Sequence, residues 1–270
     1  MLQKIRSSAL PNDVFGYLNQ QPEVHTFLAS RLHALHDRSA SEGIIYRNEQ
    51  TGAVEGVTYV GANVIPSFTT RNALFATADY LRSRKISFSS VVGSSEIVFP
   101  LWELIEQNAP PIRLLRAAQP LLSIKGEPLL TSDPQVRVAA LDDLELVIAA
   151  GTEMFIGEVG EAPQVNDFRA RAIELITLGR TFIRREGDEI LFKADIGAIG
   201  AGALQIHGVW VPPSHRGQGI GSHGMASVLR FSQQLAPIAS LYVNDFNHAA
   251  RASYKKVGFT EVGTFTSIFL

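Results

Sequence analysis

The sequence predicts a mixed α/β protein, and two observations carry this prediction. Strand-like and helix-compatible runs alternate along most of the 270 residues, in both halves of the chain. In the second half, strands first follow one another across short turns and are then separated by helices. Such an order indicates an α+β arrangement, in which helices cover both faces of a mixed sheet.

The second half gives the clearer pattern. Strands are predicted at 136–139, 181–185, 189–196, 204–211 and 239–243, with a terminal strand pair within 259–270. Helices are predicted at 142–155, 167–178, 222–235 and 248–256. An acidic pair suits the first of these helix starts, Asn166 is placed to cap the second, and the turn 186–188 joins two strands as a hairpin. We expect a looser turn over 197–202, which contains three glycines.

The first half also alternates predicted helices and strands. Helices are predicted at 13–19, 22–35, 71–85 and 94–107, and strands at 44–47, 57–64 and 87–92. The stretch 119–134 carries three prolines and is predicted to be a linker, because proline lacks the backbone N–H that a regular element uses. We therefore expect two domains, residues 1–130 and 131–270.

Composition excludes several classes of function. The formal net charge is −2 and the sequence pI is about 6.4, so there is no basic field to hold nucleic acid. The absence of cysteine removes disulfides, thiolate metal sites and acyl-cysteine chemistry, and we expect no metal site. No signal-like start and no apolar run of membrane-spanning length is present, so we expect a cytoplasmic protein without a membrane partner.

The most informative local feature is the run 206–221, in which a β-branched strand enters a loop headed by Arg216. Gly217, Gly219 and Gly221 stand at alternate positions, so successive backbone N–H groups can point into one concavity. The helix that follows would add the positive end of its dipole. This pattern favours a diphosphate-binding loop. Neither the Walker loop nor the dinucleotide fingerprint fits, since the first needs a lysine after its last glycine and the second needs a glycine at position 222.

The strand before this loop has one unusual position. Strand alternation places four residues on one face: Gln205, His207, Val209 and Val211. Gly208 interrupts the strand between them. A glycine there predicts a β-bulge or the close approach of another backbone.

A second constellation lies near the C-terminus. Asn247, Ala250 and Tyr254 are spaced three and seven residues apart, which stacks them on one face of a helix that ends before Gly258 and Phe259. Taken alone, a tyrosine at such a position is as well explained by an amphipathic core as by chemistry.

Both motifs together resemble the GCN5-related N-acetyltransferase (GNAT) family. The first resembles its acetyl-CoA motif, Arg-x-x-Gly-x-Gly after a strand, and the second resembles its signature Asn-x-x-Ala-x-x-x-Tyr-x-x-x-Gly-Phe. The resemblance implies main-chain contacts of Val209 and Val211 with pantetheine, and it places Tyr254 beside the thioester sulfur. It also implies contacts with the cofactor by these residues: Arg216, Gly217, Gln218, Gly219, Ile220, Gly221, Ser222 and Asn247.

The chemistry of acetyl transfer to an amine fits these residues. Since an alkyl ammonium has a pKa of about 10.4, only about 0.04% is neutral at pH 7, and a base or a water path must take its proton. A tyrosine hydroxyl with a pKa near 10 can protonate a thiolate whose conjugate acid has a pKa of roughly 8.5, so Tyr254 is the expected general acid. The base stays open among His207, Asp195, Glu153, Glu158 and Glu161. We favour Glu158, because it lies near the expected acceptor cleft, where a carboxylate would also attract a cationic amine.

The resemblance extends to the whole chain, which is similar to two-domain, mostly actinobacterial GNAT proteins whose N-terminal domain has no assigned function. The stretches 59–63, 100–104, 208–211 and 241–247 carry it. The first half is interpreted as a divergent GNAT-like copy, in which the strand 57–66 takes the place of the cofactor strand but no glycine series follows. The expected function is a CoA-dependent N-acetyltransferase, and the alternative is an acyl-CoA-binding regulatory or protein-interaction module without turnover. The amine acceptor, a small molecule or a protein, and the oligomeric state stay open.

Overall fold

The computed structural model describes residues 1–36, 40–83, 88–159 and 164–270. Within these residues the strands form one sheet in the order β1-β2-β3-β4-β5-β12-β6-β11-β10-β9-β8-β7. The predicted mixed α/β architecture is confirmed, since the sheet contains parallel and antiparallel pairs and helices pack on both of its faces. No helix in this described part is long and apolar enough to cross a membrane.

The two halves of the chain repeat one order of elements: a strand, two helices, three strands, a helix, a strand, a helix and a strand. In the N-terminal half these are β1 (Leu2–Ile5), α1 (Asn12–Leu18), α2 (Pro22–His33), β2 (Glu42–Arg47), β3 (Val54–Val60), β4 (Asn63–Phe68), α3 (Arg71–Ser83), β5 (Ser90–Ser94), α4 (Ser95–Ile105) and β6 (Leu114–Lys125). In the C-terminal half they are β7 (Arg137–Val138), α5 (Leu144–Val159), α6 (Val165–Thr177), β8 (Thr181–Glu186), β9 (Glu189–Gly200), β10 (Ala203–Trp210), α7 (Ile220–Ser232), β11 (Ile238–Tyr242), α8 (His248–Val257) and β12 (Thr260–Phe269).

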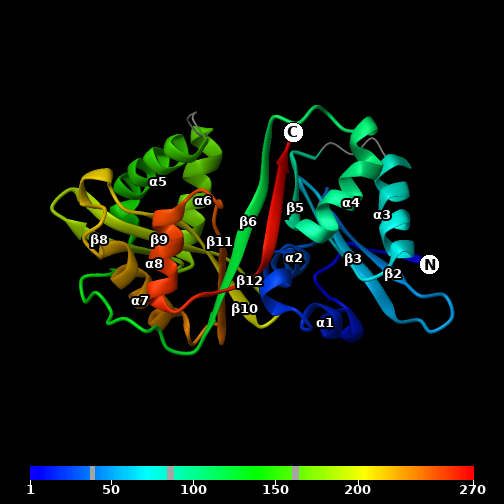
Figure 1. Ribbon diagram of the computed structural model, residues 1–270, viewed down its shortest axis with the longest axis horizontal. Coiled ribbons are helices and arrows are strands. Elements are labelled where there is room, and N and C mark those ends of the chain that lie inside the picture. The colour runs from blue at the N-terminus through cyan, green and yellow to red at the C-terminus, as the bar shows by residue number, and fades with distance from the viewer. Residues whose placement is uncertain (37–39, 84–87, 160–163) are drawn as a thin grey trace.

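The last strands of the two halves are exchanged. β6, which ends the N-terminal half, pairs along its C-terminal part with β11 of the other half. β12, which ends the chain, pairs with β6 and also inserts its last residues beside β5. Figure 1 shows β6 and β12 running side by side through the middle of the molecule. The exchange joins the halves into one continuous sheet.

This exchange corrects two predictions. Residues 119–125 of the predicted linker 119–134 belong to β6. The predicted terminal strand pair within 259–270 is instead one strand, β12, shared by two neighbouring strands. Pro120 is accommodated within β6 although it has no N–H, and its carbonyl accepts a hydrogen bond from the N–H of Val243 at 3.2 Å. The domain boundaries 1–130 and 131–270 stay a prediction.

Two smaller differences concern turns. The predicted loose turn over 197–202 is shorter, because β9 continues to Gly200 and only Ala201 and Gly202 form the turn, both with positive φ. The predicted strand 57–64 is interrupted at residues 61–62, where β3 turns directly into β4. Periodicity could not show this break, since both strands are buried and β-branched.

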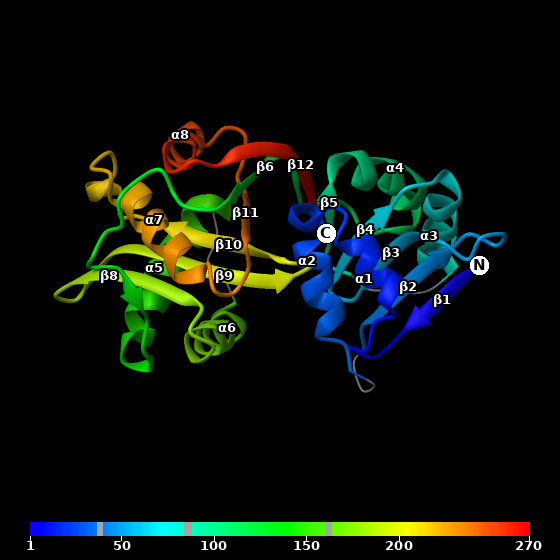
Figure 2. The ribbon, with the colours of Figure 1, turned by 90° about the horizontal axis from the view of Figure 1, so that it is seen from below.

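Among the described residues, four groups of buried apolar side chains form the core, one on each face of the sheet in each half. In the C-terminal half, α7 and α8 cover one face, and α5 and α6 cover the other. Figure 2 shows α8 and α6 on opposite sides of β9 and β10. In the N-terminal half, α1 and α2 cover one face and α3 and α4 the other.

Candidate functional site

The candidate site lies where β10 and β11 diverge. The two strands pair in parallel over three residue pairs, from Ala203 with Ile238 to Gln205 with Ser240. β10 then continues to Trp210 along β9, while β11 continues to Tyr242 along β6. Beyond Gln205 the facing edges of the two strands are therefore no longer paired with each other. Such edges present backbone N–H and C=O groups to whatever lies between them.

Gly208 forms the predicted β-bulge. Its φ is +63°, and the register between β10 and β9 shifts between His207 and Trp210. A Cβ at this position would lie 2.8 Å from Oδ2 of Asp195 and 3.1 Å from Nζ of Lys193. Both the left-handed backbone and the close approach of two side chains therefore require glycine here.

The bulge overturns the predicted arrangement of faces. Ile206 is buried in the core under α7 and α8, and Val209 and Val211 pack against that same core. Trp210 instead belongs to the core on the α5 and α6 side. The extra residue of the bulge shifts the two-residue alternation by one, so His207 does not share a face with the two valines.

The glycine loop joins the end of β10 to the first turn of α7. Gly217 and Gly219 have φ values of +79° and +83°, and Gly219 is the residue immediately before the helix. The structure gives no backbone acceptor, among the residues it describes, to the N–H groups from Gly217 to Ser222. Left-handed glycines beside a helix N-terminus form an anion-binding concavity of this kind. A Cβ at Gly217 would meet no atom within 4 Å, so the concavity is open on that side.

The side chains of the loop mainly hold its own backbone. Nε of Arg216 donates to the carbonyl of Val211 at 3.1 Å, and Oγ of Ser222 donates to the carbonyl of Gly219 at 3.0 Å. Nε2 of Gln218 donates to the carbonyl of Ser214 at 3.4 Å. These bonds tie the loop to the end of β10 and leave main-chain N–H groups as its donors.

The second motif lies on α8, next to the start of α7. Asn247 caps α8, since its Oδ1 accepts a hydrogen bond from the N–H of Ala250 at 3.2 Å. Tyr254 is buried in the same core as Ile220, with its ring edge-to-face on Phe259 at a centroid distance of 5.9 Å. An added Cβ at Gly221 would lie 3.5 Å from a methyl of Val211 and 3.9 Å from Oγ of Ser253. The two sequence motifs thus meet in space.

A buried ion pair supports the bulge, and sequence reasoning missed it. Nζ of Lys193 donates to Asp195, and both side chains are buried. The other carboxylate oxygen of Asp195 accepts from Oγ1 of Thr181 at 2.8 Å. A lysine and an aspartate two residues apart, in a strand 190–196 whose other residues are apolar, were the available signal. Because Asp195 is buried and committed to these partners, it is poorly placed to serve as a base.

The other candidate bases differ in their surroundings. His207 packs over Gly197, but its side chain is exposed to solvent. Protein nevertheless surrounds the ring closely enough that loss of hydration lowers the pKa of His207 to about 4, with the charges of Lys193 and Arg171 acting in the same direction and Asp195 opposing them. Glu153 is exposed on α5. Glu158 is in the last turn of α5, but its side chain lies outside the described residues, as does Glu161 altogether.

The N-terminal half repeats the divergence without the loop. β4 and β5 pair in parallel only from Asn63 with Ser90 to Val64 with Val91. The chain then passes from Phe68 to Arg71, the first residue of α3, across two threonines. This connection contains no glycine, as the sequence indicates.

The comparisons with known proteins agree with this geometry. Residues 163–259 match the model of the acetyltransferase (GNAT) family, and residues 43–147 match a family described as a domain of unknown function (DUF4081). No match was found among curated proteins.

Several solved structures share the fold over nearly the whole chain. A GNAT-family acetyltransferase from Colwellia psychrerythraea has a TM-score of 0.59 at 11% identity, covering 100% of this chain and 99% of its own. A GCN5-related N-acetyltransferase from Sphaerobacter thermophilus has a TM-score of 0.61 at 13% identity, covering 99% and 94%. A tandem GNAT protein from the clavulanic acid biosynthesis pathway has a TM-score of 0.54 at 10% identity, covering 99% and 98%. The C-terminal half of the chain is therefore a GNAT-family domain within a tandem GNAT-like fold, and by this domain the chain is an acyltransferase.

Proposed function

We propose that this protein is a CoA-dependent N-acetyltransferase that moves an acetyl group from acetyl-CoA to a primary amine by direct attack in a ternary complex. The observation that carries the proposal is the divergence of β10 and β11 directly before a loop whose N–H groups, from Gly217 to Ser222, have no backbone acceptor among the described residues. Acetyl-CoA supplies the acetyl group as a thioester. The unpaired facing edges of β10 and β11 would receive the extended arm of the cofactor, and the N–H groups of the loop would receive its diphosphate.

The residues present fit acetyl-CoA. The main-chain N–H groups from Gly217 to Ser222 would hold the diphosphate at the positive end of α7. The main-chain N–H of Arg216, which was expected to join them, donates instead to the carbonyl of Pro213 at 3.4 Å. Val209 and Val211 would offer backbone groups to the pantetheine amides, since they follow the bulge on the diverging edge. Asn247, at the start of α8, would contact the same arm.

Tyr254 is the proposed general acid. Its position on α8, in the same core as Ile220 and Val209, supports this role because those residues belong to the loop helix and to β10. A phenol there would return a proton to the sulfur that leaves, because its ordinary pKa near 10 lies above the value of roughly 8.5 for a thiol. Holding both reactants in one geometry would supply much of the rate, about 7 to 11 kcal/mol at most. The N–H of Val209 would polarise the carbonyl.

The proton of the amine needs an acceptor, and Glu158 remains the proposed base. It lies at the end of α5, on the side of the sheet where His207 is found. His207 is neutral at pH 7, since its pKa is lowered to about 4, and it would be a weak acceptor for a proton from an amine. A carboxylate would also attract the cationic form of the acceptor.

Tyr254→Phe tests the enzymatic role. We expect turnover to fall at least about tenfold while the dissociation constant for acetyl-CoA stays within about twofold, because only the proton is lost. The matched control is Tyr46→Phe, on β2 of the other half, which should change neither value. Unchanged turnover in Tyr254→Phe would remove this residue from its role.

A second candidate function follows from the packing of Tyr254. Its buried ring packs on Phe259, and this packing alone would explain a tyrosine at this position. In that case the chain binds acyl-CoA as a regulatory or protein-interaction module and does not turn over. Calorimetry and a coupled assay for free CoA separate the two. Binding of acetyl-CoA without release of CoA across a panel of small amines, polyamines and lysine peptides would favour the binding module.

A further inference from the structure

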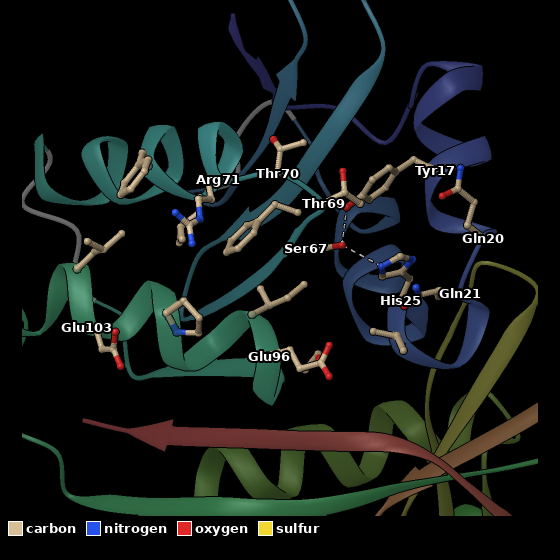
Figure 3. A pocket seen from close by; sticks show the side chains of 18 residues that line it. Tyr17, Gln20, Gln21, His25, Ser67, Thr69, Thr70, Arg71, Glu96 and Glu103 are labelled. Carbon is tan, nitrogen blue, oxygen red and sulfur yellow. Dashed lines mark hydrogen bonds between the residues drawn. The ribbon is translucent and has the colours of Figure 1, made fainter.

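A pocket of about 640 Å³ lies in the N-terminal half, where β4 and β5 diverge beside the start of α3 and along α4. Figure 3 shows it between these two helices, with α1 and α2 closing one end. It occupies the place that corresponds, by the repeated order of elements, to the candidate site of the C-terminal half. The glycine loop is missing here, so its lining must define a different ligand.

Three buried side chains form a hydrogen-bonded chain at the wall of this pocket. Tyr17 comes from α1, His25 from α2 and Ser67 from β4. Oη of Tyr17 lies 2.8 Å from Oγ of Ser67, which lies 2.9 Å from Nε2 of His25. Nδ1 of His25 lies 2.8 Å from the carbonyl oxygen of Leu18. The dashed lines in Figure 3 follow the link from Tyr17 through Ser67 to His25.

The direction of these hydrogen bonds follows from the carbonyl of Leu18. A carbonyl only accepts, so Nδ1 of His25 carries the hydrogen. Burial lowers the pKa of His25, which keeps the ring neutral at pH 7 and makes Nε2 an acceptor. Ser67 therefore donates to His25, and Tyr17 donates to Ser67. Because the hydroxyl hydrogen of Tyr17 is donated to Ser67, the oxygen of Tyr17 can only accept hydrogen bonds from a ligand in the pocket.

The charged residues of the pocket are mostly acidic. Glu96 and Glu103 of α4 line it, opposed by Arg71 of α3. The structure gives none of these three an ion pair with the residues it describes. A neighbouring hollow of about 740 Å³ shares Glu96 with the pocket and adds Glu23. The combined space thus has three carboxylates against one guanidinium.

We propose that this pocket binds a small organic amine as its ammonium ion. The ammonium donates hydrogen bonds to Oη of Tyr17 and to the carboxylate of Glu96, and an apolar body packs on the lining side chains Phe68, Leu74, Ile97 and Pro100. Acceptors on the wall and an excess of carboxylates select a cationic donor over an anion. The site is separate from the glycine loop of the C-terminal half and does not depend on the proposed acyl transfer.

Calorimetric titration of the full chain at pH 7, without acetyl-CoA, tests this site. The probes are 2-phenylethylamine and 3-phenylpropanoate, which share an apolar body and carry opposite charges. We expect saturable binding of the amine, at least about tenfold tighter than that of the carboxylate. Glu96→Gln and Tyr17→Phe should each weaken the amine about five- to tenfold or more, because each removes one acceptor. Glu96 is exposed, so its substitution should leave folding intact.

Arg71→Gln and Gly219→Val complete the design. Arg71→Gln should leave the amine bound equally or more tightly, and Gly219→Val, which alters the glycine loop of the C-terminal half, should leave amine binding unchanged. The proposal is overturned by tighter binding of the carboxylate that depends on Arg71, or by amine binding that survives both Glu96→Gln and Tyr17→Phe. It is equally overturned if the amine shows no saturable binding up to about 10 mM.

Discussion

Gly208→Ala tests the bulge that shapes the candidate site. The added methyl group would lie 2.8 Å from Oδ2 of Asp195 and 3.1 Å from Nζ of Lys193, in a backbone with φ of +63°. Neither neighbour can move freely, because the two form a buried ion pair and Asp195 also accepts a hydrogen bond from Oγ1 of Thr181. The substitution therefore combines backbone strain with crowding.

The expected cost follows from these two effects. An alanine in the left-handed region costs roughly 1–2 kcal/mol, and crowding a well-packed interior costs about 1–3 kcal/mol more. We expect Gly208→Ala to lose about 2–5 kcal/mol of unfolding free energy. Gly52→Ala is the matched control, since Gly52 has φ of +72° but no atom within 4 Å of an added Cβ. It should lose only the strain, about 1–2 kcal/mol.

Urea denaturation with linear extrapolation measures both values, and thermal unfolding checks them, since 1 kcal/mol shifts the midpoint by roughly 2–4 °C at this size. Acetyl-CoA affinity should also fall in Gly208→Ala, because the bulge directs the backbone of Val209 and Val211. Equal losses of stability in Gly208→Ala and Gly52→Ala would refute the argument that close packing beneath the bulge requires glycine.

Three further predictions concern the ion pair, the strand exchange and pH. Lys193→Met should lower the free energy of unfolding by about 3–5 kcal/mol, because it leaves the charge of Asp195 buried and unpaired. Adding Asp195→Leu should recover much of this loss in urea denaturation, and no recovery would contradict the pairing. Fragments 1–130 and 131–270 should fold only when co-expressed, since each lacks a central strand that the other supplies; two separately folded monomers by circular dichroism and gel filtration would refute this. The pKa of His207 is lowered from 6.5 to about 4, so between these pH values the folded state binds fewer protons than the unfolded chain. The free energy of unfolding should therefore fall as the pH is lowered through this range, and it should fall less steeply in His207→Asn. An equal slope in the two proteins would argue against the shift.

Local sequence features predicted much of the candidate site. The left-handed glycines and the bulge at Gly208 each depend on a few neighbouring residues, which glycine spacing reveals. Caps were not predicted correctly: Asn247 caps α8 although it was expected on a helix face, and the predicted cap Asn166 lies inside α6. The general base was not predictable in this way, since its role depends on distances between separate elements. Cofactor contacts and the role of Tyr254 stay proposals.

The features that sequence reasoning missed are non-local. Nothing within 114–125 indicates that β6 pairs with β11 of the other half, because strand partners are chosen by the assembled sheet. The change of face along β10 could be recognised only from the bulge at Gly208 together with the register of β10 against β9. The chain from Tyr17 to His25 through Ser67 joins two helices to a strand about forty to fifty positions away, which only the tertiary structure shows.

A crystal structure with acetyl-CoA bound is the most direct test of the central claim. We expect phosphate oxygens within hydrogen-bonding distance of the N–H groups from Gly217 to Ser222, pantetheine between β10 and β11, and the thioester sulfur beside Tyr254. Acetyl-CoA seated in the N-terminal pocket instead, or on the C-terminal half with its diphosphate away from this loop, would contradict the account.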